Sequence, residues 1–137
     1  MGLFDWFKKK NPNERSAKRL QDILAELGRL PEEGELTRDV IDSMYTQTTV
    51  IVEASGIFLE TLRIGMEVDA AEVKTLITQL AEDWVLSLND YESDIINGIA
   101  EVLGDGHRSV TLMREVVTVC RQILDQRMLE RAQPPAG

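Results

Sequence analysis

The sequence predicts an all-α protein, a four-helix antiparallel bundle with long helices that is completed by self-association. Apolar residues recur with the 3.6-residue period of an α-helix through almost the whole chain after residue 11. Several predicted helices carry apolar arcs wider than the stripe of about 100° that one neighbouring helix covers, so they need neighbours on two sides. A chain of 137 residues is long enough for one such domain with its own core.

Three segments are expected along the chain. Residues 1–10 form an amphipathic N-terminal segment, residues 11–131 form the helical bundle domain, and residues 132–137 form a disordered tail that contains two prolines. Because 43% of the residues are hydrophobic but only 5% are aromatic, we expect a core that is mostly aliphatic.

The first helix of the bundle is predicted to begin at Pro12. Asn11 is a favoured N-cap, proline is favoured at the first helical position, and Glu14 lies three residues after the cap. Gly28 is well placed to end the helix, and residues 29–35 form a loop. The apolar stripe covers about 120°, which suits a single neighbour. It consists of Ala17, Leu20, Ile23, Leu24 and Leu27.

A second helix is predicted from about Thr37 to Ile64. On its far side, Val50, Ile57 and Ile64 recur every seven residues, and we assign this second stripe to self-association because two apolar faces need two neighbours. Residues 46–52 have strand propensity, but the helical period continues on both flanks and favours a helix. The main apolar face consists of Val40, Ile41, Met44, Tyr45, Thr48, Ile51, Val52, Ser55, Leu59 and Leu62.

The longest predicted helix runs from Asp69 to about Leu103. Asp69 and Glu72 form a capping box that marks its start, and the Gly-Asp-Gly sequence at residues 104–106 ends it in a tight turn. Its apolar residues fill about 200° of arc. They are Val73, Leu76, Ile77, Leu80, Ala81, Trp84, Val85, Leu88, Tyr91, Ile95, Ile96, Ile99, Val102 and Leu103.

This helix has one weak point. Asn89 and Glu92 have capping-box spacing in the middle of the helix. The alternatives are therefore a continuous helix and a helix with a kink or break near residue 89.

The last helix is predicted from Ser109 to Arg131. Its apolar arc covers about 180°, so it too needs more than one neighbour. Cys120 lies on this arc and is expected to be a buried, inert thiol. The arc consists of Val110, Leu112, Met113, Val116, Val117, Val119, Cys120, Ile123, Leu124 and Met128.

The first ten residues are the most distinctive local feature. As a helix, one leucine and three aromatic side chains fall within about 160° of arc, and three lysines follow at the C-terminal end. Aromatic rings at the headgroup boundary and ammonium groups near lipid phosphates make a short interfacial anchor for an anionic membrane surface. The alternative is that the apolar side chains fold back on the bundle. The predicted membrane-binding residues are Leu3, Phe4, Trp6, Phe7, Lys8, Lys9 and Lys10.

The charge distribution agrees with this division. Residues 1–20 carry a net charge of +4, residues 21–107 of −15 and residues 108–137 of +2, which gives −9 for the chain. The acidic body would repel nucleic acid, so no nucleic-acid partner is expected, whereas the leading segment would not repel an anionic surface.

The sequence offers little chemistry. His107, the only histidine, lies in a glycine-rich turn and is expected to be solvated, and a single cysteine excludes an intramolecular disulfide and a cysteine-rich zinc site. Neither the Glu-x-x-His pair of a di-iron bundle nor a phosphate-binding glycine pattern occurs. We therefore expect no catalytic residue, no metal and no cofactor, and a protein that is not an enzyme.

Residues 17–21 read Ala-Lys-Arg-Leu-Gln and follow the amphipathic segment. Residues 1–26 thereby resemble the N-terminal part of the MinE family, the topological specificity factors of bacterial division-site placement, in which a short membrane segment with lysines precedes a motif of the form A-K-x-R-L-Q. One residue of that motif is missing here, and the family's other half is a small α/β dimerisation unit. The resemblance implies that Lys18, Arg19 and Leu20 contact a membrane-cycling ATPase.

The leading hypothesis is a cytoplasmic, bacterial-type adaptor or scaffold that self-associates as a dimer and binds a membrane surface or a partner protein. No apolar run approaches the ~20 residues of a spanning helix, and the lysines follow the short N-terminal apolar stretch, which is unlike a signal peptide. One alternative is a regulator of a membrane-cycling ATPase, as the MinE resemblance implies. The other is a small helical enzyme or ligand carrier, which requires a pocket near Tyr45, Thr48 and Trp84.

Overall fold

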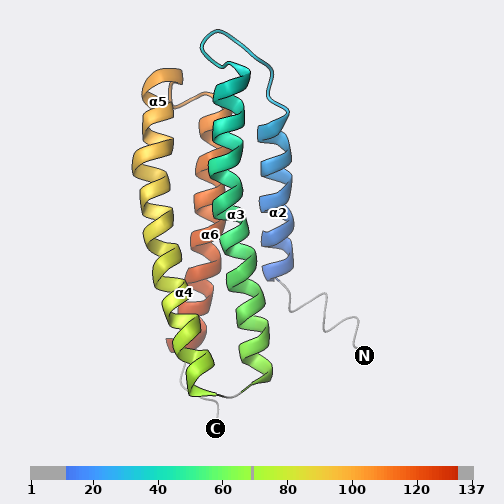
Figure 1. The fold of residues 1–137 in the computed structure, drawn as a ribbon, viewed down its shortest axis with the longest axis vertical. Coiled ribbons are helices and arrows are strands. Elements are labelled where there is room, and N and C mark those ends of the chain that lie inside the picture. Colours follow the sequence, from blue (N-terminus) through green and yellow to red (C-terminus); the bar gives the residue numbers. More distant parts are fainter. Residues whose placement is uncertain (1–11, 69, 133–137) are drawn as a thin grey trace.

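The computed structural model describes residues 12–68 and 70–132, without the side chains of residues 12, 13, 66 and 126–132. In this part of the chain four long helical rods lie side by side in one bundle (Figure 1). The predicted all-α helical bundle is therefore confirmed. The rods are α2 (Pro12–Gly28), α3 (Arg38–Glu67), a continuous run of α4 (Ala71–Asp90), the π-helical segment η1 (Tyr91–Ile96) and α5 (Asn97–Leu103), and finally α6 (Arg108–Ala132).

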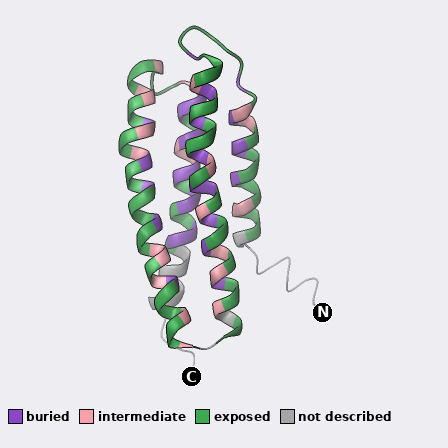
Figure 2. Ribbon diagram, in the orientation of Figure 1, coloured by how far each residue is buried: buried purple, intermediate pink, exposed green. Residues whose placement is uncertain are grey.

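Rods that are consecutive in the chain run antiparallel, with α3 and α6 between α2 on one side and the α4–α5 run on the other (Figure 1). Because α6 contacts α2, α3, η1 and α5, its wide apolar arc is buried within a single chain (Figure 2). The last helix therefore offers no surplus apolar surface for self-association over the residues whose side chains are described. Its most deeply buried apolar residues are Val110, Leu112, Met113, Val116, Val117 and Cys120.

The boundaries of α2 and α3 lie close to the predicted ones. α2 begins at Pro12 and ends at Gly28 as expected. α3 follows an N-cap at Thr37, whose Oγ1 accepts a hydrogen bond from the Val40 N–H at 3.3 Å. The β-branched residues 46–52 are helical, because packing of the 3.6-residue face outweighs their strand propensity.

Two ion pairs align α2 with α6. Arg19 Nη2 of α2 donates to Glu115 Oε2 of α6 at 2.7 Å, and Arg108 Nε of α6 donates to Glu26 Oε1 of α2 at 2.9 Å. The pairs are seven residues apart on each helix and step in opposite directions, as antiparallel helices require. Exposed pairs of this kind contribute little stability, but they mark the register.

The α4–α5 run begins later than expected. α4 starts at Ala71, two residues after the predicted start, with Ala70 at its N-cap and no side-chain cap bond there. Asp69, the predicted cap, lies outside the described residues, as do residues 1–11 and residues 133–137 of the predicted tail.

The weak point near residue 89 is a π-helical turn, not a break. The helix continues through η1, and Asn89 and Glu92 do not form the second capping pair that their spacing indicated. Arg121 Nη2 of α6 instead donates to Asn89 Oδ1 at 3.4 Å and to Glu92 Oε1 at 3.0 Å. Both side chains therefore fasten this turn to α6.

The turn between α5 and α6 depends on two residues. Gly104 has a φ of 95°, a conformation that favours glycine, and its N–H donates to the Ala100 carbonyl at 2.8 Å to end α5. His107 Nδ1 accepts from the Ser109 N–H at 3.1 Å and so caps α6, as an asparagine would. His107 is therefore a half-buried cap and not the solvated turn residue that its surroundings indicated.

Candidate interaction surface

The outer face of α3 carries the stripe that we assigned to self-association. Val50 is 59% exposed, Ile57 60% and Ile64 43%. Their heptad spacing places them on one side of the helix, away from the buried Phe58 and Leu62. No described helix covers this stripe, so its exposure agrees with the assignment, while the pairing of two copies stays a prediction.

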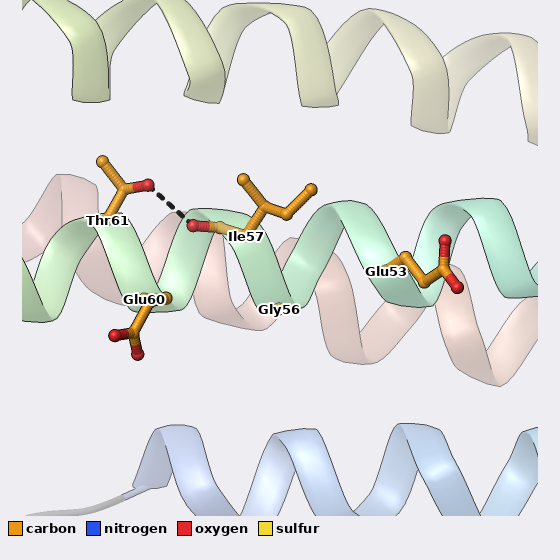
Figure 3. A pocket seen from close by; sticks show the side chains of 5 residues that line it. All are labelled: Glu53, Gly56, Ile57, Glu60 and Thr61. Atoms are coloured by element: carbon orange, nitrogen blue, oxygen red, sulfur yellow. Dashed lines mark hydrogen bonds between the residues drawn. The ribbon is translucent and has the colours of Figure 1, made fainter.

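A shallow hollow of about 490 Å³ lies at the middle of this stripe (Figure 3). A Cβ atom on Gly56 would meet no other atom within 4 Å, so the floor of the hollow is open. In Figure 3, Ile57 and Thr61 point toward the α4 side and Glu60 toward the α2 side, which gives the hollow one apolar and one acidic edge. The Thr61 hydroxyl is satisfied, since Oγ1 donates to the Ile57 carbonyl at 2.8 Å. The lining residues are Glu53, Gly56, Ile57, Glu60 and Thr61.

An acidic stripe runs beside the apolar one with the same heptad spacing: Glu53, Glu60 and Glu67. Arg63 Nε donates to Glu60 Oε2 at 3.1 Å, and Arg63 Nη1 donates to Glu67 Oε1 at 3.4 Å. The Arg63 hydrogen bond lowers the pKa of Glu60. Glu53 forms no ion pair with a described residue. Three carboxylates and one guanidinium thus leave this edge net negative.

The apolar surface continues to the end of α3, where α3 and α4 approach closely. A Cβ atom on Gly65 would lie 2.5 Å from Ile77 Cδ1 and 3.2 Å from Val73 Cγ1, so a larger residue would displace these side chains. Val68, four residues after Ile64 and at the C-cap of α3, is also exposed. The stripe therefore reaches the end of the bundle.

The residues that the MinE resemblance assigns to an ATPase contact do not share one face. Leu20 is fully buried among the inward residues of α2, which removes it from the predicted partner-binding set. Lys18 and Arg19 are exposed, and the hydrogen bond from Arg19 to Glu115 raises the pKa of the Arg19 guanidinium. A partner contact stays a prediction for Lys18 and Arg19.

The predicted membrane-binding residues lie outside the described part of the chain. The structure places only the point where their segment joins the bundle, which is Pro12 at the start of α2. The residues concerned are Leu3, Phe4, Trp6, Phe7, Lys8, Lys9 and Lys10.

Tyr45, Thr48 and Trp84 do not line a common pocket. Thr48 is buried, and its Oγ1 lies 2.6 Å from the Tyr91 hydroxyl. Trp84 packs on Phe58 with 5.0 Å between ring centroids, ten residues and about 15 Å along α3 from Thr48. Tyr45 lies at the surface. Each of the three residues thus belongs to a separate contact.

The buried polar groups indicate a structural role. Burial raises the pKa of the Cys120 thiol to about 12, so the thiol is protonated and unreactive at neutral pH, as predicted. Burial also raises the pKa of Tyr91, an effect that the hydrogen bond with Thr48 partly offsets. Trp84 Nε1 is buried without a hydrogen-bond partner among the described residues, so this indole contributes packing alone.

Two kinds of feature are absent from residues 12–68 and 70–132. There, no group of three or more His, Cys, Asp or Glu side chains is arranged to hold a metal ion. In the same part of the chain, no helix combines the length and apolar character needed to cross a bilayer.

Sequence reasoning missed the acidic edge of the hollow, and it also left the buried Phe58 out of the apolar face of α3. The signal for the acidic edge was present, because glutamate recurs every seven residues beside the apolar heptad. Phe58 lies at the border between the main face and the outer stripe, where periodicity alone does not decide burial.

Comparisons with known proteins give no relative. No family model, no curated protein and no solved structure matches the chain.

Proposed function

We propose that this protein is a non-catalytic helical adaptor that self-associates and attaches peripherally to an anionic membrane surface at the cytoplasmic side. The observation that carries the proposal is the apolar stripe of Val50, Ile57 and Ile64, exposed on a helix whose opposite face is packed. Contiguous apolar surface on a folded protein is commonly a site of protein or membrane interaction. The absence of a shared pocket at Tyr45, Thr48 and Trp84 favours an adaptor over a carrier.

Membrane attachment rests on residues 1–10. Burying a large apolar side chain contributes about 1.5 to 3 kcal/mol, and each lysine near an anionic leaflet contributes about 1 kcal/mol. One leucine, three aromatic rings and three lysines, less the entropy of ordering the segment, support weak and reversible attachment. Such an adaptor exchanges between the surface and solution.

Co-sedimentation of the full chain with vesicles tests the attachment. We expect pelleting with vesicles that contain phosphatidylserine, little pelleting with pure phosphatidylcholine, and a strong loss in a Trp6→Ser, Phe7→Ser variant. Leu86→Ser is the matched control, because Leu86 is an exposed apolar residue of the bundle itself. Equal pelleting of the wild type, the Trp6→Ser, Phe7→Ser variant and the Leu86→Ser variant would contradict attachment through residues 1–10.

A cysteine at position 57 tests self-association. Ile57 is the middle residue of the stripe, so a two-fold axis through the centre brings residue 57 of two copies together in either a parallel or an antiparallel pair. We expect Ile57→Cys to form a disulfide-linked dimer on anionic vesicles, where bound chains are concentrated. The buried Cys120 does not compete, because its pKa is about 12.

The matched control is Val102→Cys, since Val102 on α5 is 63% exposed, close to the exposure of Ile57. It should give far less dimer than Ile57→Cys. Equal yields from the two positions would indicate random collision, and no dimer from Ile57→Cys would refute pairing through α3.

A further inference from the structure

We propose that the hollow on α3 is the docking site of the chain's own residues 1–10 when no membrane is present. The inference rests on the proposed function, because it takes residues 1–10 as a basic amphipathic segment. It adds to the proposed function in two ways. Residues 1–10 bind the α3 face as well as a membrane, and the α3 face binds residues 1–10 as well as a second copy of the chain.

The chemistry of the two surfaces is complementary. The hollow has an apolar edge at Ile57 and an acidic edge at Glu53 and Glu60, in an outer face of α3 that has a surplus of carboxylates. Residues 1–10 contain one leucine and three aromatic residues, followed by three consecutive lysines, and a single acidic residue. Apolar contacts and charge-assisted hydrogen bonds therefore form side by side when this segment lies over the hollow.

The register of the bundle places the C-terminal end of residues 1–10 beside the hollow. α2 and α3 are antiparallel (Figure 1), and a Cβ atom on Gly28 of α2 would lie 3.0 Å from the Tyr45 ring of α3. Pro12 lies sixteen residues before Gly28, and Thr61 lies sixteen residues after Tyr45, so both are at the same level of the bundle. Thr61 is one of the residues that line the hollow.

The segment is also long enough. Axes of packed helices are about 8–10 Å apart, and ten residues span about 15 Å as a helix or up to about 33 Å when extended. The hollow extends from Glu53 to Thr61, about 12 Å along α3. The lysines directly precede Asn11 and Pro12, so they reach the level of Glu60 first, and the apolar side chains follow.

The chain's own segment is favoured over that of a second copy. Tethering through Asn11 gives residues 1–10 an effective concentration of about millimolar at the hollow, above that of free chains in solution. An anionic membrane competes for the same lysines and apolar side chains. Docking consequently reduces the apparent membrane affinity to the intrinsic affinity multiplied by the undocked fraction of the chains.

Acrylamide quenching of tryptophan fluorescence in the lipid-free full chain tests the docking. Trp84 is 3% exposed, so the quencher reports on Trp6. A Glu53→Lys, Glu60→Lys variant should raise the quenching constant roughly two- to tenfold by releasing the segment. The same variant should pellet with less phosphatidylserine in the vesicles than the wild type needs.

Two further variants make the result specific. Glu82→Lys, Glu101→Lys changes the charge equally at exposed sites on α4 and α5 and should leave the quenching constant unchanged. In Gly56→Gln the new Cβ meets no atom within 4 Å, and the longer side chain occupies space in the hollow. This variant should raise the quenching constant even if the charge-reversed variant folds poorly.

Three outcomes would overturn the inference. The quencher could reach Trp6 as easily in the wild type as in the Gly56→Gln variant, or both charge-reversed variants could raise the quenching constant equally. The third outcome is a shielding of Trp6 that grows with protein concentration. The last would assign the hollow to a second copy. The proposed function fails separately, because a chain that shields Trp6 but never pellets with anionic vesicles retains the docking and refutes the attachment.

Discussion

The buried hydrogen bond between Thr48 of α3 and Tyr91 of η1 permits a sharp test of the packing. Thr48 Oγ1 and Tyr91 Oη are 2.6 Å apart, and both residues have almost no exposed surface. Thr48→Val leaves the Tyr91 hydroxyl buried without its partner, which costs about 1–3 kcal/mol. Tyr91→Phe should cost less, about 1 kcal/mol, because a threonine hydroxyl in a helix can turn to the carbonyl four residues before it.

The double variant decides whether these hydroxyls interact. With both polar groups removed, neither is left unsatisfied, so the combined loss of unfolding free energy should be smaller than the sum of the single losses by about 1 kcal/mol. Urea unfolding followed by circular dichroism gives the four free energies. Thr61→Val is the control, since Thr61 bonds only to its own helix, and it should change stability by less than about 0.5 kcal/mol.

Additive losses in the Thr48→Val, Tyr91→Phe variant would refute this reasoning, because they would show that each hydroxyl is satisfied elsewhere.

Three further predictions follow from burial. Because burial raises the pKa values of Cys120 and Tyr91, the unfolded chain releases these protons at a lower pH than the folded chain does. The unfolding free energy should therefore stay at its full value below about pH 9 and fall above it, by up to about 1.4 kcal/mol per pH unit for each group. Urea unfolding at stepwise pH measures this loss. Gly56→Ala should raise the unfolding free energy by about 0.5–1 kcal/mol, because alanine favours a helix interior over glycine and the new Cβ meets nothing within 4 Å. A decrease in the melting temperature would contradict this. Phe58→Ala should cost about 3–5 kcal/mol through loss of its packing on Trp84, and a loss below 1 kcal/mol in urea unfolding would contradict the burial of this ring.

Helix positions and most core residues were predictable from the sequence, because they depend on local patterns. Proline at the first helical position, glycine at the last, and the 3.6-residue period define α2 as they do in the structure. The same period correctly outweighed the strand propensity of residues 46–52.

The arrangement of the helices was not predictable in the same way. A wide apolar arc indicates that a helix packs against several neighbours, but it does not indicate whether those neighbours belong to the same chain. For α6 the neighbours are α2, α3, η1 and α5 of the same chain, whereas the second stripe of α3 stays exposed. The π-helical turn was likewise not predictable, because the spacing of Asn89 and Glu92 is that of a helix cap. Their contact with Arg121 of α6 is a tertiary interaction, which the local sequence does not indicate.

If residues 1–10 and a second copy both use the outer face of α3, the two events exclude each other. A membrane that removes the segment frees the face, so membrane binding promotes self-association, and by reciprocity self-association raises membrane affinity by the same factor. The docking equilibrium limits that factor: a segment docked in nine of ten chains lowers the apparent affinity for either ligand about tenfold. In the Gly56→Gln variant the coupling should therefore disappear together with the shielding of Trp6. Residual coupling in that variant would show that concentration of chains on the surface, and not release of the face, drives pairing.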